Sequence, residues 1–334
     1  MPCPRMTSHP IPDAFLCPID DFGLLDFEGP DARAFLQGQL SNDVGALSHG
    51  HGQWSSYNSP KGRVLANFWL WQAPGGLGLE RYDALVAADL ADAMQKRLSM
   101  FVLRAKVHVT DRTPGCRFFG VAGTGASAAL TAVYGRAPAA GEALELAGVH
   151  VQIVALPDGR FVVIVPAESA GAVDEALSRH AMRTDAERWR AFGIAAGIPW
   201  ITAATSDLFV AQMINWDALA GVNFQKGCYP GQEVVARMRY LGRLKERLFL
   251  LHADAPPPAA GTRLFSPAFG EQPCGTVVNA APDQRGGTEL LAVVQLAAID
   301  APDLTLAAPG GVVLEPRTLP YPLPETVSPR GRIT

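Results

Sequence analysis

The sequence predicts an α+β fold with antiparallel sheets, followed by a small β-barrel or sandwich. Three observations support this prediction. Up to about residue 240, the order strand, helix, strands, helix, strand occurs twice. Turn clusters at residues 58–62 and 157–160 indicate β-hairpins in this part. After about residue 245, helical patterns are absent and short apolar runs alternate with proline and glycine.

In the first repeat, Pro30 and Asp31 open a helix with apolar residues on one face. The second hairpin arm carries large groups on both faces, so we expect both faces to be covered. Its Trp69 and Trp71 therefore suit a core better than a stacking platform. The predicted elements are strand 22–28, helix 30–40, hairpin 53–72, helix 84–98 and half-exposed strand 101–110.

In the second repeat, the segment from Thr184 to Glu187 fits a capping box and starts a further helix. The other elements predicted there are strand 116–121, helix 125–135, hairpin arms 150–154 and 161–165, and helix 167–180. The strands predicted in the last part are 247–251, 262–265, 275–278, 290–294 and 311–314.

Composition excludes several classes of protein. The chain has 334 residues, 48% of them hydrophobic and 18% charged, which is typical of a globular protein of two or three domains. The net charge of -4 argues against a generally basic nucleic-acid binder. There is no apolar run long enough to span a membrane, and the polar start lacks a signal core, so we expect a cytoplasmic protein without a membrane partner.

The five cysteines are odd in number, scattered and without a CxxC pair. This pattern argues against a disulfide framework and against an intrinsic zinc or iron–sulfur site. The cysteines are Cys3, Cys17, Cys116, Cys228 and Cys274.

One of them, Cys228, stands in an unusual segment with Lys226 beside it and Gly227 and Gly231 around it. We expect Pro230 to be the first residue of a helix, which would place the thiol just outside a helix N-terminus. That position and the lysine would both lower the pKa of the thiol. The segment predicts a reactive or ligand-binding thiol; the alternative is a small buried residue, the commoner role of a free cysteine.

The segment at residues 226–233, Lys-Gly-Cys-Tyr-Pro-Gly-Gln-Glu, resembles the signature of the YgfZ-type folate-binding protein family, relatives of the glycine cleavage T-protein, an aminomethyltransferase. Further similarity lies at residues 31–44, 59–66, 197–199 and 212–215. The motif residues carried over are Lys226, Gly227, Cys228, Tyr229, Gly231, Gln232 and Glu233, although Gln232 and Glu233 could equally cap the helix.

The resemblance implies two interleaved ferredoxin-like subdomains around a folate site, then a small C-terminal β-barrel. On this basis we expect a disordered tail at residues 1–13, the folate-binding module at 14–240, the barrel at 241–318 and a second tail at 319–334.

The resemblance also implies a function: a tetrahydrofolate-binding accessory protein for assembly, maintenance or repair of iron–sulfur enzymes. Cys228 would be the catalytic residue, either as a transient cluster ligand or through thiol redox chemistry. The implied partners are folate and iron–sulfur enzymes or cluster-assembly proteins, with tRNA modification affected indirectly.

The folate contacts implied by the resemblance are Tyr57, Asn58, Lys61, Gln212 and Arg237. Two departures from the aminomethyltransferases matter. Residues 61–65 contain no carboxylate to act as the catalytic acid, so a classical transferase is not expected. Ala195 occupies the place of a pterin-binding glutamate, for which Gln212 or Asp217 could substitute.

Residues 226–247 form a basic segment, which is either a solvated face with long arginine stems or an anion site for folate carboxylates or RNA. Two alternative functions therefore remain: direct tRNA binding or modification, and folate-dependent one-carbon transfer with displaced acids. The basic residues are Lys226, Arg237, Arg239, Arg243, Lys245 and Arg247, against Glu233 and Glu246.

Overall fold

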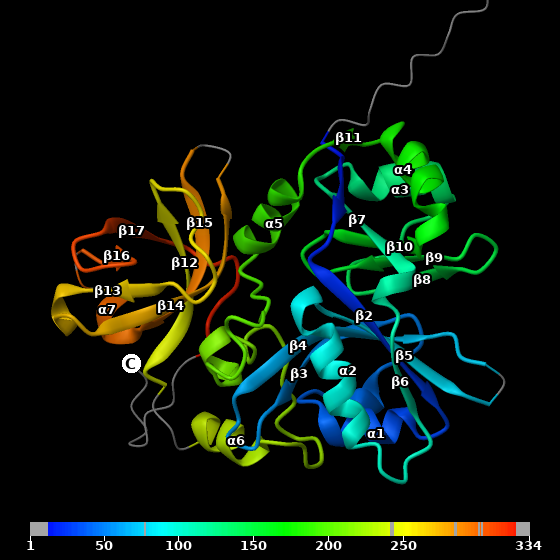
Figure 1. Cartoon of the computed structure of the whole chain (residues 1–334), viewed down its shortest axis with the longest axis horizontal. Coiled ribbons are helices and arrows are strands. Elements are labelled where there is room, and N and C mark those ends of the chain that lie inside the picture. Colours follow the sequence, from blue (N-terminus) through cyan, green and yellow to red (C-terminus); the bar gives the residue numbers. More distant parts are fainter. Residues whose placement is uncertain are drawn as a thin grey trace, which may run out of the picture.

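The computed structural model describes residues 13–76, 78–240, 244–283, 286–299, 301 and 303–324. Two α+β units lie beside a β-barrel, with helix α5 between the barrel and the second unit (Figure 1). The predicted α+β class and the C-terminal barrel are confirmed.

The first unit is a five-stranded antiparallel sheet of order β3-β4-β5-β2-β6. Without β3, the succession β2-α1-β4-β5-α2-β6 has the ferredoxin-like order, and β3 extends its edge. Both faces of β4 are buried, as predicted. The elements are β2 Phe22–Gly29, α1 Ala32–Gln39, β3 Gly52–Asn58, β4 Val64–Ala73, β5 Glu80–Ala87, α2 Ala91–Met100 and β6 His108–Asp111.

The second unit is a six-stranded sheet of order β11-β1-β7-β10-β9-β8. Strand β1 is inserted between two of its strands, antiparallel to β7 and parallel to β11. The chain therefore begins in the second unit, builds the first and returns, which is the interleaving that the family resemblance implied. The elements are β1 Phe15–Ile19, β7 Cys116–Ala122, α3 Ala126–Tyr134, β8 Ala143–Leu146, β9 Val151–Ala155, β10 Phe161–Pro166, α4 Ala170–Ser178 and β11 Met182–Arg183.

The third part is a closed barrel of order β12-β15-β14-β13-β16-β17. Helix α5, whose N-cap Asp185 accepts from Arg188 N, packs against β14 of the barrel and β1 of the second sheet. The elements are α5 Ala186–Ala195, α6 Gln232–Tyr240, β12 Glu246–Ala253, β13 Arg263–Phe265, β14 Pro273–Pro282, β15 Thr288–Gln295, α7 Leu296–Ile299, β16 Thr305–Leu306 and β17 Val312–Arg317.

Two sequence predictions are wrong in the first unit. The helix expected from residue 84 begins at Ala91, because residues 84–87 complete β5 in the middle of the sheet. Short apolar runs in a buried strand cannot be distinguished from a buried helix by period alone. The strand expected over residues 101–110 is limited to β6, and Leu103, expected on its apolar face, is 87% exposed with a φ of 46°.

The expected C-terminal tail is also wrong in part. Leu319 packs against the main core, and the Tyr321 hydroxyl donates to Gly197 O at 2.7 Å and accepts from Asn215 Nδ2 at 3.3 Å. Residues 319–324 thus return from the barrel to the α+β units. The rest of the two expected tails, residues 1–12 and 325–334, lies outside the described residues.

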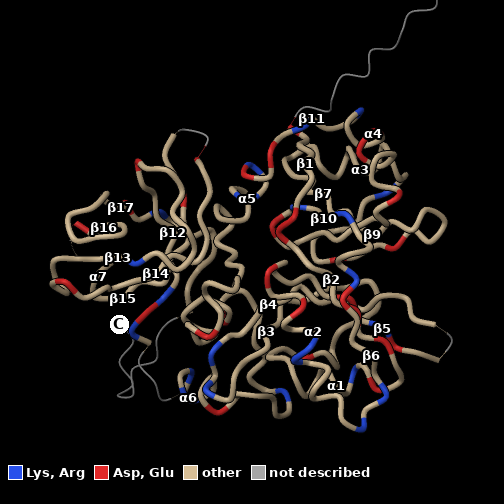
Figure 2. The backbone as a smooth tube through the Cα atoms, viewed as in Figure 1, with Lys and Arg blue, Asp and Glu red and all other residues tan. Residues whose placement is uncertain are grey.

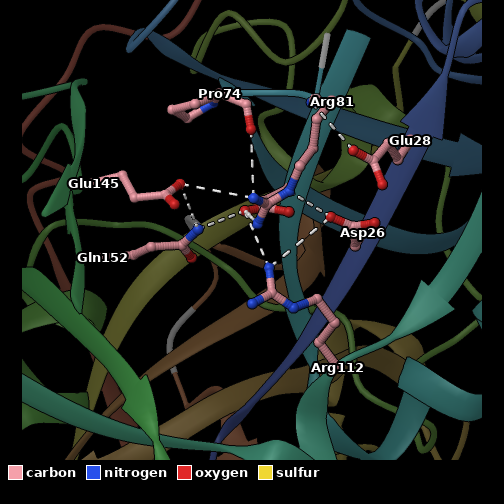
Figure 3. Close-up of polar contacts among 9 residues, drawn as sticks. Asp26, Glu28, Pro74, Arg81, Arg112, Glu145 and Gln152 are labelled. Carbon is pink, nitrogen blue, oxygen red and sulfur yellow. Dashed lines mark hydrogen bonds and ion pairs between the residues drawn. The ribbon is translucent and has the colours of Figure 1, made fainter. Parts of the chain in front are cut away.

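A buried ionic cluster joins the two α+β units (Figure 3). Arg81 on β5 binds Asp26 on β2 at 2.6 Å and Asp83 at 2.8 Å. Gln152 Nε2, on β9 of the other unit, donates to Asp83 at 2.8 Å and to Glu145 on β8 at 3.2 Å. Burial, and to a lesser degree the neighbouring Asp26 carboxylate, raise the pKa of Asp83 to about 7.

We expect Asp83→Asn to alter how stability depends on pH. Because the folded-state pKa of Asp83 lies above its unfolded value, the folded protein binds this proton more tightly between about pH 4 and 7. The contribution of Asp83 to the free energy of unfolding therefore falls as pH rises through that window. The stability of the variant relative to wild type should increase by about 1 kcal/mol or more between acidic and mildly alkaline pH, measured by urea unfolding.

The exposed Asp92, which pairs with Lys96 on α2, provides the control variant Asp92→Asn. Its stability relative to wild type should stay nearly constant over the same range. A pH-independent difference for Asp83→Asn would contradict the prediction.

Candidate functional site

Cys228 is the only solvent-exposed thiol among the described cysteines. Cys17 on β1 and Cys116 on β7 are buried in the six-stranded sheet, and Cys274 on β14 is buried in the barrel. Burial raises the pKa of each of these thiols, that of Cys17 to about 12. Cys3 lies outside the described residues. A reagent or partner that approaches the described surface can therefore reach one thiol.

Lys226 holds the loop that carries this thiol. Its ammonium donates to three backbone carbonyls at the end of α1: Gln37 O at 2.7 Å, Leu40 O at 2.5 Å and Asn42 O at 2.9 Å. The last carbonyls of a helix lack intrahelical partners and carry the negative end of its dipole, so a cation is favourable there. Burial lowers the pKa of Lys226 to about 8. The cation that we expected to act on the thiol thus serves to anchor the loop.

Two glycines fix the same loop from the other side. Gly231 has a φ of 77°, and a Cβ on it would lie 2.5 Å from Ser59 O and 2.6 Å from Gly62 Cα. Gly62, at the tip of the β3–β4 hairpin, has a φ of 73°, and a Cβ there would lie 2.7 Å from Val234 Cβ. The loop and the hairpin tip therefore pack backbone against backbone, which only glycine allows.

The loop also departs from the predicted helix start. Helix α6 begins at Gln232, not at Pro230, so Cys228 lies on the loop rather than next to the first turn. Gln232 Nε2 donates to Lys226 O at 3.3 Å, which closes the loop on itself. Tyr229 is buried, and the Lys226 ammonium lies 5.3 Å from the centroid of its ring. Glu233 is exposed on α6.

The five residues expected to bind folate differ in exposure and in the element that carries them. Tyr57 and Asn58 are buried in β3, whereas Lys61 on the hairpin tip and Arg237 on α6 are exposed. Gln212 is buried and donates to Val235 O of α6 at 2.7 Å. The hairpin tip, Gln212 and α6 are thus neighbours.

A cavity of ≈ 770 Å³ lies on the other side of the β3–β4 hairpin, between it, the loop after α5 and the C-terminal segment. Its aromatic wall is centred on Trp54, 4.8 Å from the Trp69 ring. Neither Gln53 Nε2 nor Trp69 Nε1 has a hydrogen-bond acceptor within the described part of the chain. The size suits a small-molecule site. Its lining residues include Asn42, Gln53, Trp54, Trp69, Ala196, Ile198 and Tyr321.

Asn42 connects this cavity with the thiol loop. Its carbonyl accepts from Lys226, and its side-chain amide donates to Trp54 O and Ala220 O, both at 2.8 Å. Sequence reasoning missed Asn42 and Trp54 as site residues; the only signal was that Asn42 lies in a segment similar to the family. Ala195 is exposed, and its neighbour Ala196 lines the cavity.

Burial removes part of the basic segment from the surface. Figure 2 marks the lysines and arginines along the backbone in blue, those of α6 among them. The Lys226 ammonium is bound to carbonyls at the end of α1. The Arg247 guanidinium is buried and contacts Asp217 at 3.0 Å and Asn215 Oδ1 at 2.8 Å. Asp217 is therefore not available as a pterin acceptor. Arg243 lies outside the described residues. Among the described residues of this segment, the exposed cations are Arg237, Arg239 and Lys245.

The fold is similar to that of the glycine cleavage T-proteins. The structure matches that of glycine cleavage system aminomethyltransferase T from Bartonella henselae with a TM-score of 0.75 and 18% identity, over 94% of this chain and 87% of that chain. A scan against protein-family models finds no match. Among the described residues, no helix has the length and hydrophobicity needed to cross a bilayer.

Sequence comparison identifies the family. The chain is 33% identical over 316 residues to the tRNA-modifying protein YgfZ of Yersinia pestis (strain Pestoides F), which covers 93% of both chains. It is 32% identical over 314 residues to the protein of that name from Enterobacter sp. (strain 638), covering 93% of this chain and 94% of the other. The chain belongs to the YgfZ family.

We expect Gly231→Ala to destabilise the protein by about 1–3 kcal/mol, because the added Cβ meets backbone atoms and the φ is strained. Gly227→Ala is the matched control in the same loop, since a Cβ there meets nothing within 4 Å. It should change stability by less than about 0.5 kcal/mol. Urea unfolding of both variants measures the difference, and equal effects would refute the backbone packing described above.

Proposed function

We propose that this protein is a tetrahydrofolate-binding accessory factor for assembly, maintenance or repair of iron–sulfur enzymes, acting through Cys228. The observation that carries the proposal is the connection through Lys226 and Asn42, which ties an exposed thiol on a rigid loop to a cavity of small-molecule size. We expect occupation of the cavity to affect the position of the thiol through the hydrogen bonds of Asn42 and Lys226.

Tetrahydrofolate fits the donor set of the cavity. Its flat pterin carries oxygen and nitrogen acceptors, which suit the unpartnered Gln53 Nε2 and Trp69 Nε1, and its rings suit the face of Trp54. When bound, folate supplies a carrier of one-carbon units. Lys61 and Arg237, exposed near the thiol loop, are our candidates for the glutamate carboxylates.

A thiol on a rigid, exposed loop suits a transient ligand for a partner's cluster, because iron–sulfur centres bind soft thiolates. In such an exchange the thiol proton passes to solvent as the sulfur–iron bond forms. A redox role for the thiol remains the alternative within this proposal. Intracellular iron–sulfur enzymes and cluster-assembly proteins are the proposed partners.

We infer that tRNA modification, named in the relatives, is affected through iron–sulfur enzymes rather than by direct binding. Three exposed cations, Arg237, Arg239 and Lys245, offer little charge for an RNA backbone. One-carbon transfer is disfavoured for lack of a free carboxylate that could act as the catalytic acid among the described residues of the cavity lining. Asp158, the one carboxylate among the described residues that line the ≈ 770 Å³ cavity, is held by Arg160 at 2.6 Å.

We expect Cys228→Ala to fold normally and to fail to restore iron–sulfur enzyme activity in cells that lack the protein. Cys116→Ala removes a buried thiol and serves as the control, to be compared at equal abundance. Loss of the exposed ligand should reduce the restored activity to the level without the protein, whereas the control should restore it. Equal restoration by both variants would remove Cys228 from the mechanism.

We expect Ala218→Trp, which fills part of the ≈ 770 Å³ cavity, to weaken tetrahydrofolate binding. A tenfold weaker affinity corresponds to about 1.4 kcal/mol of lost contact free energy, and at least this change is expected in anaerobic calorimetry. Ala203→Trp, at an exposed position outside the cavity lining, is the control. Unchanged binding in Ala218→Trp would move the folate site elsewhere.

A further inference from the structure

A second, smaller cavity of ≈ 220 Å³ lies where α5, the start of β2 and the barrel strand β14 meet. Three aromatic side chains wall it: Phe22 lies 4.7 Å from the Trp200 ring and 5.6 Å from the Trp189 ring. Trp200 is held to the barrel by its backbone: the amide N–H donates to Asn279 Oδ1 at 2.8 Å, and the carbonyl accepts from Asn279 Nδ2 at 3.0 Å. The walls are therefore rigid and suited to a flat ring.

A buried cation with an unused donor lines this cavity. Arg160 is 3% exposed; its Nε donates to Asp158 at 2.6 Å and its Nη1 to Trp189 O at 3.4 Å, while Nη2 has no partner among the described residues. The guanidinium stacks 4.2 Å from the Trp189 ring centroid. It lies against Gly193, where a Cβ would meet it at 2.6 Å. Buried guanidinium donors are rarely left unsatisfied, so an acceptor is missing here.

An unused acceptor lines the same cavity. Asp21 Oδ1 accepts from Arg190 Nε at 2.7 Å, but Asp21 Oδ2 has no partner within the described structure. Trp200 Nε1, also on a lining residue, has none either. The two cations, Arg160 and Arg190, are each already paired with an aspartate, so the site is close to neutral.

We propose that this cavity binds a small, neutral, flat ring with an amide edge, such as an aromatic carboxamide. The carbonyl of the amide would accept from Arg160 Nη2, and its N–H would donate to Asp21 Oδ2, while the ring lies among Phe22, Trp189 and Trp200. The volume holds a single substituted ring. The site is separate from the ≈ 770 Å³ cavity proposed for folate, with Ile198 as a shared wall.

Benzamide is the probe that tests this proposal, with benzoate and benzyl alcohol as comparisons. Saturation-transfer NMR on the full chain should detect benzamide, with benzoate weaker because it has no donor for Asp21. Ala260→Phe and Ala280→Phe narrow the cavity from the barrel side, and each should weaken benzamide binding by at least about tenfold. Ala259→Phe, exposed and outside the cavity lining, should leave it unchanged.

Asp21→Asn gives a sharper test, because the new amide can donate where the carboxylate could only accept. It should reverse the preference in favour of benzoate. Absence of benzamide binding, binding unaffected by both Ala260→Phe and Ala280→Phe, or benzoate bound more tightly than benzamide by the wild type would overturn the proposal. Displacement of benzamide by tetrahydrofolate would overturn the separation of the two sites without touching the role of Cys228.

Discussion

The hydrogen bonds of the Lys226 ammonium at the end of α1 are the interaction on which the thiol site depends. Removing an ammonium from water costs several kcal/mol, and here the three carbonyls, the ring of Tyr229 and the nearby Asp43 carboxylate offset part of that cost. The same contacts give three backbone carbonyls at the end of α1 a charged donor. The ammonium and the helix carbonyls therefore stabilise one another, and this contact fixes the position of Cys228, two residues after Lys226.

Buried polar contacts also fix how the three parts of the molecule fit together. One hydrophobic core cluster contains residues from both α+β units and from the barrel, so apolar contact holds the parts together without specifying their register. Gln152 on β9 sets the register between the two sheets, because it donates to Asp83 on β5, which Arg81 also binds. Arg247 in β12 does so for the barrel through Asp217 and Asn215. A buried charge that loses its partner is costly, so these pairs favour one arrangement over shifted ones.

Sequence reasoning succeeded where the signal was local. The hairpins at residues 58–62 and 157–160 follow from turn chemistry, and both are observed. The helix expected from the Thr184–Glu187 capping box is also observed, although its N-cap is Asp185, one residue later than Thr184. It failed at residues 84–87, which are fully buried in β5 and therefore show no alternating pattern. The insertion of β1 between β7 and β11 could not be read from its own residues, because such pairing is decided by segments far away in the chain.

The sequence located the site at the Cys228 segment, but it did not predict what each side chain contacts there. Lys226 was expected near the sulfur because it is adjacent in sequence, yet a long side chain reaches carbonyls of a helix distant along the chain. Asn42 and Trp54 carry no motif of their own and become neighbours of the thiol loop only through the fold.

The placement of Cys228 bears on how its sulfur could act. The ammonium of Lys226 contacts carbonyls at the end of α1, and helix α6 begins only at Gln232. Both features were expected next to the sulfur. A nucleophile would need such help from within the protein to become a thiolate. A ligand does not, because a metal ion deprotonates the thiol that coordinates it. The geometry therefore favours, within the proposed function, an exposed sulfur that becomes a thiolate when a partner's iron arrives.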